Sequence, residues 1–207
     1  MNSDYPKGAV KLKLGIFGGT FNPPHIGHLR LVEAVADELS LDRVLIIPAA
    51  IPPHKNAPDL ADGEDRLMMC RLTFGEDRRF EVSNTELRRH GRSYTYDTLC
   101  GIREQYPEDE IFLIVGSDML ETFDRWYRYR DILSMCTLCA AARERDFSPN
   151  LEKVFSKEEL KKVRFINIDV TEVSSTQIRR LISEGGSAGD FLTGETAQYI
   201  EQRGLYR

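Results

Sequence analysis

Short apolar runs alternate with longer amphipathic segments along this chain, and this alternation limits its fold more than any other feature. The clearest run, Ile111–Val115, is continuously apolar and has the length of a buried strand. By contrast, residues 28–39 place apolar side chains on one face at helical spacing. Strands separated by helices predict a parallel sheet that is covered on both faces.

The expected strands are residues 12–17, 44–47, 111–115, 137–142 and 163–168, with a further extended segment at 80–87. The expected helices are 28–39, 64–74, 94–105, 176–183 and 194–202, the third of them capped by Ser93 or Thr95. We therefore predict an α/β fold: a Rossmann-like, doubly wound parallel sheet in a single domain with a small C-terminal helical part. Ligands of such sheets bind beyond the carboxyl ends of the strands.

The composition excludes several classes of protein. The 207 residues suffice for one full core, so we expect a flexible extension at 1–11 and one domain at 12–207. No run approaches the length of a transmembrane helix, and the first residues lack the apolar segment of a secretory signal, so a cytoplasmic protein is expected. The formal net charge of −5 gives no general attraction to nucleic acid or anionic membrane, so neither is an expected partner. The oligomeric state is left open, a homo-oligomer included.

Cys136 and Cys139 form a C-x-x-C sequence. A zinc or redox site would need a second pair of ligands or a helix N-terminus, and neither is evident. We interpret these cysteines as small apolar side chains of a buried strand.

The segment 15–28 reads GIFGGTFNPPHIGH. Gly18 and Gly19 follow the first expected strand, where backbone N–H groups can face an anion, and Thr20 adds a hydroxyl. His25 and His28 are three residues apart at the expected start of a helix, so both can reach one phosphate chain. Imidazoles donate hydrogen bonds and can be cationic near neutral pH. The segment therefore predicts a phosphate site, although it matches neither the Walker loop nor the usual dinucleotide fingerprint.

A second candidate anion site lies in the segment 172–180, which reads EVSSTQIRR. Ser174, Ser175 and Thr176 cluster at the expected start of a helix, and Arg179 and Arg180 lie one turn further on. Hydroxyls, free N–H groups and a guanidinium at one helix end together predict anion binding.

These segments resemble known signatures. HIGH at 25–28 resembles the H-x-G-H signature of the nucleotidyltransferase superfamily, and SSTQIR resembles the S-S-T-x-I-R signature of small adenylyltransferases. Further segments resemble bacterial nicotinate-nucleotide adenylyltransferases: IPPHK at 51–55, SYTYDT at 93–98, GSD at 116–118, WY at 126–127 and GLYR at 204–207. Class I aminoacyl-tRNA synthetases also carry HIGH, but this chain lacks their KMSKS segment and has no room for tRNA binding.

The resemblance implies an enzyme of NAD biosynthesis. Its partners are small-molecule substrates: it transfers the adenylyl group of ATP to nicotinate mononucleotide, giving nicotinate adenine dinucleotide and pyrophosphate, with Mg²⁺ accompanying ATP. By position, the resemblance implies catalytic roles for His25, His28, Lys55 and Arg179. ATP and its phosphates would contact Gly18, Gly19, Thr20, Gly116, Asp118, Ser175 and Thr176. Nicotinate mononucleotide would contact Thr95, Trp126 and Tyr127. We expect no metal site built from protein side chains alone.

Three places leave questions open. Asn22 stands where many relatives have aspartate, so we assign it no catalytic role. Ala142-Arg143-Glu144 replaces a motif that often has two basic residues and a proline. His90 and Arg92 lie beside SYT at 93–95, and we interpret them as exposed loop charge.

Four alternative functions also remain. Two are adenylyltransferases, one acting on nicotinamide mononucleotide and the other on phosphopantetheine. The third is a cytidylyltransferase, and the fourth is a non-catalytic nucleotide sensor on the same fold.

Overall fold

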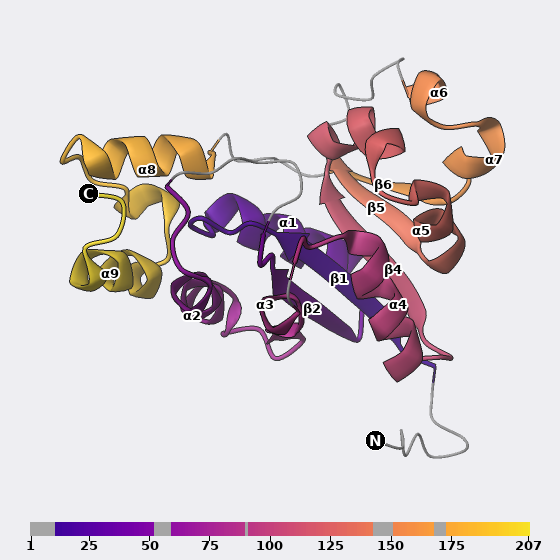
Figure 1. Cartoon of the computed structure of the whole chain (residues 1–207), viewed down its shortest axis with the longest axis horizontal. Helices are drawn as coiled ribbons and strands as arrows, with labels where there is room; N and C mark the ends of the chain where they lie inside the picture. Colours follow the sequence, from indigo (N-terminus) through magenta and orange to yellow (C-terminus); the bar gives the residue numbers. More distant parts are fainter. Residues whose placement is uncertain (1–10, 52–58, 90, 143–150, 168–172) are drawn as a thin grey trace.

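The computed structural model describes residues 11–51, 59–89, 91–142, 151–167 and 173–207. At its centre lies a six-stranded parallel sheet of order β3-β2-β1-β4-β5-β6 (Figure 1). The strands are β1 (Lys13–Gly19), β2 (Arg43–Pro48), β3 (Phe80–Val82), β4 (Glu110–Gly116), β5 (Thr137–Ala142) and β6 (Val163–Asn167). Strand order reverses direction between β1 and β4, and doubly wound sheets bind their ligands at such a switch point. The predicted Rossmann-like sheet is confirmed.

Helices cover both faces of the sheet. One face, with Leu14, Leu113 and Leu138, packs against α4 (Thr95–Gln105), the 3₁₀ helix η1 (Ser117–Arg125), α5 (Tyr129–Met135) and α6 (Leu151–Val154). The opposite face, with Phe17 and Ile114, packs against α1 (Ile26–Glu38) and α2 (Gly63–Phe74). Two short helices, α3 (Thr85–Arg88) and α7 (Lys157–Leu160), complete this part.

The C-terminal helices form a third cluster beside α2 (Figure 1). It consists of α8 (Ser175–Ser183), the 3₁₀ helix η3 (Gly189–Phe191) and α9 (Gly194–Arg203), which bury Ile178, Leu192 and Ile200 against Met69. Buried hydroxyls of Thr73 and Thr196 also join α2 to α9 at 2.9 Å. The C-terminal helical part is therefore packed against α2.

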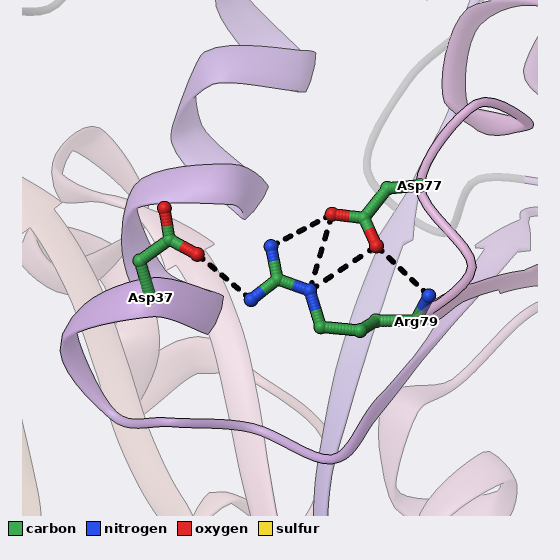
Figure 2. A network of polar contacts seen from close by, with 3 residues as sticks. All are labelled: Asp37, Asp77 and Arg79. Atoms are coloured by element: carbon green, nitrogen blue, oxygen red, sulfur yellow. Dashed lines mark hydrogen bonds and ion pairs between the residues drawn. The ribbon is translucent and has the colours of Figure 1, made fainter.

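One polar network fastens the end of α1 to the turn before β3 (Figure 2). Arg79 donates from Nη1 to Asp37 at 2.7 Å and from Nη2 to Asp77 at 2.7 Å. The hydrogen bonds that Arg79 donates to Asp77 hold the pKa of that carboxyl below its usual value. Because α1 returns toward the start of β2, the network lies at the amino edge of the sheet, away from the candidate site.

Two local expectations were wrong. The segment 80–87 is extended only to Val82, because α3 begins at Thr85. Neither Ser93 nor Thr95 caps α4: Tyr94 occupies the cap position, and the Ser93 hydroxyl instead accepts the N–H of Ala50 at 2.9 Å. The other expected elements agree to within a few residues, although the expected end of β6 at Ile168 and most of the N-terminal extension lie outside the described residues.

Within the part that the structure describes, no helix is both long and apolar enough to cross a bilayer.

Candidate functional site

The loop after β1 lies at the switch point of the sheet. A Cβ atom on Gly19 would lie 2.9 Å from the ring of Phe21, so this packing requires a glycine. Phe21 has a φ of 48°, in the left-handed region that non-glycine residues rarely adopt. Its buried ring packs edge-on against Phe17 and His28. Gly18, by contrast, is exposed, and open space surrounds its Cβ position among the described residues. Packing thus holds a strained loop at the sheet edge, and such strain is frequent at ligand sites.

His25 and His28 lie together at the start of α1. His25 is the N-cap residue, and the two ring centroids are 3.6 Å apart. The backbone N–H of His25 donates to Nδ1 of His28 at 3.2 Å. Because Nδ1 accepts, a neutral His28 carries its proton on Nε2. The structure thus brings the two histidines together, as their spacing predicts.

His25 differs in charge from the sequence-based expectation. Its side chain is buried, and burial lowers its pKa to about 4, so the imidazole is neutral at pH 7. Among the described residues its Nδ1 also has no hydrogen-bond partner. A buried polar atom without a partner calls for an explanation, and a bound ligand is one.

The second candidate anion site meets the first. Ser174 is the N-cap residue of α8. From the same helix, Ser175 donates to the carbonyl of Pro23 at 2.8 Å, and Nη1 of Arg179 donates to the carbonyl of Asn22 at 3.0 Å. Nε of Arg179 is buried and has no partner among the described residues. Two segments about 150 residues apart in the sequence therefore form one junction at the loop after β1. The remaining hydroxyl of this group, on Thr176, is exposed.

Asn22 lies at the centre of this junction. Its buried amide donates from Nδ2 to the carbonyl of Asp59 at 2.9 Å. Its Oδ1 accepts from the N–H of Ala61 at 3.0 Å and from the hydroxyl of Tyr206 at 2.8 Å. A carboxylate at this position could not donate to Asp59. The amide therefore makes structural contacts within this junction.

Gly116 is the last residue of β4, the neighbour of β1 across the switch point, and Asp118 follows in η1. A Cβ atom on residue 116 would lie 2.6 Å from Oδ1 of Asp118, so glycine allows this carboxylate to fold back over the strand end. Asp118 itself is exposed. The two residues thus present a carboxylate at the same edge of the sheet as the loop after β1.

An aromatic contact joins the two segments that hold the remaining candidates, Thr95, Trp126 and Tyr127. Tyr127, which is 49% exposed, lies with its ring centroid 4.9 Å from that of Tyr94, the residue before Thr95. Trp126 is half-buried, and its ring packs on Phe123 with centroids 5.0 Å apart. The segments 93–98 and 126–127 therefore adjoin, and part of the Trp126 ring belongs to the core.

Several predicted positions carry no further structural account. Lys55, His90, Arg143 and Glu144 lie outside the described residues, and Ala142 is the last residue of β5. Arg92 is exposed and forms an isolated bridge with Ile51.

The C-x-x-C cysteines belong to the core. Cys136 packs on one face of the sheet and Cys139 on the other, and burial raises the pKa of each thiol to about 12. Both thiols are buried as expected, but only Cys139 is a strand residue, because β5 begins at Thr137 and Cys136 is the C-cap residue of α5. Across the described ranges, no group of three His, Cys, Asp or Glu side chains is placed to hold a metal ion.

Sequence reasoning missed Arg66. This arginine is only 1% exposed, and its guanidinium donates to main-chain carbonyls of Thr20, Ala49, Ala50 and Ala61. In the sequence it follows Glu64 and Asp65, which is typical of a solvated first turn of a helix. No local pattern marks it, because its partners are backbone atoms of two connections, the loop after β1 and the segment between β2 and α2.

Comparisons with known proteins agree on one family. Residues 16–181 match the family described as cytidylyltransferase-like. A probable nicotinate-nucleotide adenylyltransferase of Listeria monocytogenes is 36% identical over 197 residues, which cover 95% of this chain and 98% of the relative. The nicotinate-nucleotide adenylyltransferase of Bacillus subtilis is 34% identical over 194 residues, covering 94% and 98% of the two chains.

A solved structure agrees on the fold. The nicotinic acid mononucleotide adenylyltransferase of Plasmodium falciparum, complexed with APC, superposes with a TM-score of 0.73 over 94% of this chain and 97% of that one. At 18% sequence identity this likeness concerns the fold alone.

Proposed function

The chain belongs to the nicotinate-nucleotide adenylyltransferases within the cytidylyltransferase-like family, and on this premise we propose that it adenylylates nicotinate mononucleotide with ATP. The products are nicotinate adenine dinucleotide and pyrophosphate, which makes the protein an enzyme of NAD biosynthesis.

One observation carries this proposal. The start of α8 is hydrogen-bonded to the loop after β1 through Ser175 and Arg179. Two helix N-termini, each with partial positive charge, and two histidines therefore meet at one place on the sheet edge. An extended polyanion is the ligand that such a paired arrangement suits best.

The proposed reaction is a direct displacement. A 5′-phosphate oxygen of nicotinate mononucleotide attacks the α-phosphorus of ATP, a new P–O bond forms, and the bond to the leaving pyrophosphate breaks. The attacking phosphate is already an anion at neutral pH, so the step needs neither a general base nor a covalent enzyme intermediate. Catalysis then consists of aligning two polyanions and stabilising the charge that develops on the leaving oxygens.

The chain's own residues supply that stabilisation. We assign the imidazole of His28 to a hydrogen bond with the transferred phosphate chain, because it lies beside His25 at the positively charged start of α1. The buried Nδ1 of His25 and Nε of Arg179 are the two buried side-chain atoms without a partner among the described residues, and both belong to this junction. Gly18, Gly19 and Thr20 would add backbone and hydroxyl donors.

Three further residues complete this clamp. Ser175 and Thr176 would contact the phosphates, and Ser175 also holds the loop through its hydrogen bond to Pro23. Lys55 is assigned to the phosphates by its place in the family signature alone.

The substrate bases are assigned to the two flanking segments. Gly116 and Asp118 would lie at the adenosine, with the carboxylate accepting from ribose hydroxyls. Thr95, Trp126 and Tyr127 would hold the nicotinate ring by stacking and by hydrogen bonds to its carboxylate. The contact between Tyr94 and Tyr127 supports this grouping, since it joins the two segments.

We propose that Mg²⁺ enters with ATP. Protein sites for Mg²⁺ often use one or two carboxylates together with substrate phosphates. When bound, the ion would neutralise charge on the triphosphate.

The test is release of pyrophosphate from ATP and Mg²⁺ with each of three acceptors: nicotinate mononucleotide, nicotinamide mononucleotide and phosphopantetheine. We expect a strong preference for the first. A preference for another acceptor would overturn the assignment of Thr95, Trp126 and Tyr127 while keeping the phosphate site. ATP binding without pyrophosphate release in any reaction would favour the nucleotide sensor instead.

A further inference from the structure

Arg66 is the largest of the fully buried side chains. It lies in the first turn of α2, at the end of that helix where the dipole is positive, so the helix itself disfavours a cation there. Burial lowers the pKa of this arginine, but a guanidinium stays charged in proteins. A buried charge in an unfavourable position needs strong compensation.

The compensation comes from main-chain carbonyls. Nη1 donates to Thr20 at 2.9 Å and to Ala49 at 2.6 Å, and Nε donates to Ala61 at 2.9 Å. A longer contact of 3.4 Å joins Nη2 to Ala50. Among the described residues Arg66 forms no ion pair; Asp62 acts on it only at longer range. Carbonyl partners therefore orient the guanidinium without cancelling its charge.

These carbonyls belong to the ends of neighbouring strands. The ladder between β1 and β2 ends at Gly19 and Pro48, and one further bond joins the N–H of Ala49 to the carbonyl of Gly19 at 2.9 Å. Thr20 and Ala49 then have no further ladder partners. The guanidinium takes both of their carbonyls and so closes the end of the β1–β2 pair.

This contact also fixes a peptide unit of the loop after β1. In a planar trans peptide the C=O and N–H groups point in opposite directions. Because the Thr20 carbonyl faces Arg66, the N–H of Phe21 points away from α2. Phe21 follows with its left-handed φ of 48°, so the loop depends on contacts of this kind to hold its shape.

We propose that Arg66 is a positioning residue for the ATP phosphates: its guanidinium fork holds the Thr20–Phe21 peptide in the orientation that phosphate binding requires and places an uncancelled positive charge behind the loop. This inference rests on the proposed function. It adds a role for a residue that does not touch the substrates. Because the net charge of −5 opposes the binding of a polyanion, a local positive charge behind the loop contributes more to its affinity.

The test compares Arg66→Lys, which keeps the charge but loses the fork, with Arg66→Met, which loses both. Arg71→Lys is the matched control, since Arg71 lies on the same helix and is exposed. For each variant we would measure the melting temperature, then kcat and the two KM values at a temperature where the protein is folded. If Arg66→Met does not fold, the kinetic constants of Arg66→Lys alone test the inference.

For Arg66→Lys we expect KM for ATP to rise about tenfold, the effect of losing about one hydrogen bond to a charged group, while KM for the acceptor changes less than about twofold. Arg71→Lys is expected to behave as wild type. A lower melting temperature with both KM values unchanged, or with both raised equally, would overturn the inference and leave Arg66 a structural residue.

The affinity for ATP, measured by calorimetry in parallel, separates this inference from the proposed function. If wild type binds ATP but releases no pyrophosphate with any acceptor, the proposed function fails. The Arg66 inference then stands or falls on whether Arg66→Lys weakens ATP binding by the same factor of about ten.

Discussion

Burial of His25 links the stability of the fold to pH. Its pKa is about 4 in the folded protein against 6.5 for an exposed histidine. The unfolded chain therefore binds this proton more tightly, so stability is complete above pH 6.5 and falls as the pH drops through 4. Between pH 7 and 4.5 we expect His25 to account for a loss of about 2–3 kcal/mol in unfolding free energy.

Urea denaturation at both pH values measures this effect, with His25→Asn as the variant that lacks the titrating group. The difference in stability between pH 7 and 4.5 should be smaller in the variant by that amount. An NMR titration of the wild-type imidazole supplies a direct check, and a pKa above 6 for His25 would contradict its burial.

His28 provides the second prediction at the scale of single residues. Replacing it by alanine removes one preorganised donor to the transferred phosphate, and such losses lower kcat by about 10²–10³. Steady-state kinetics under saturating substrates measure the change, and circular dichroism checks that α1 survives. Turnover close to wild type would remove His28 from the mechanism.

The placement of individual side chains was most predictable from the sequence where neighbouring residues form one motif. The spacing of His25 and His28 was enough to predict that their rings meet, because a helix start fixes which side chains adjoin. The charge of His25 was not predictable, since it depends on burial. Arg66 was not predictable either, because its partners are carbonyls that any residue type provides.

At the scale of elements, the junction between the segment that follows α9 and the loop after β1 can be tested through Tyr206. Its hydroxyl is one of the two donors to Oδ1 of Asn22. Tyr206→Phe removes this hydrogen bond and keeps the ring, so we expect a loss of about 0.5–1.5 kcal/mol in unfolding free energy.

Tyr129→Phe is the control for this variant, because among the described residues the Tyr129 side chain makes ring contacts and no hydrogen bond. Its stability should change by less than about 0.5 kcal/mol. Equal changes in the two variants, measured by chemical denaturation, would mean that the Tyr206 hydroxyl does not hold the C-terminal segment.

The strands were the most predictable elements. Continuous apolar runs such as Ile111–Val115 can be buried on both faces only in the middle of a parallel sheet, and β4 occupies that place. The short helices were not predicted: α3, α6 and α7 are four residues each, too short for a periodic pattern. The cap of α4 was wrong because the Ser93 hydroxyl is used by the neighbouring segment at Ala50.

At the scale of the whole molecule, the reactivity of the thiols tests whether the fold opens as one unit. Cys70, Cys136 and Cys139 are buried and Cys100 is half-buried. At mildly alkaline pH we expect only Cys100 to react with a disulfide reagent in the native protein, and the other three to react at the rate of global unfolding.

Thiol counting in native buffer and in denaturant measures this, and Cys100→Ser should abolish the native reaction. Rapid labelling of a second thiol in that variant would show that one face of the sheet opens by itself. The cores on the two faces would then not unfold together.

The contacts of Asn22 also bear on the order in which parts of the protein fold during synthesis. Its carbonyl and its amide meet residues 157 and 184 positions later in the chain. During synthesis the loop after β1 emerges long before either partner exists, and closing such long loops is a late event in folding. A nascent chain that contains β1 and α1 cannot form this junction until Tyr206 has been added. The enzyme would therefore gain activity only once residue 206 has been synthesised, and shorter nascent fragments would not consume ATP.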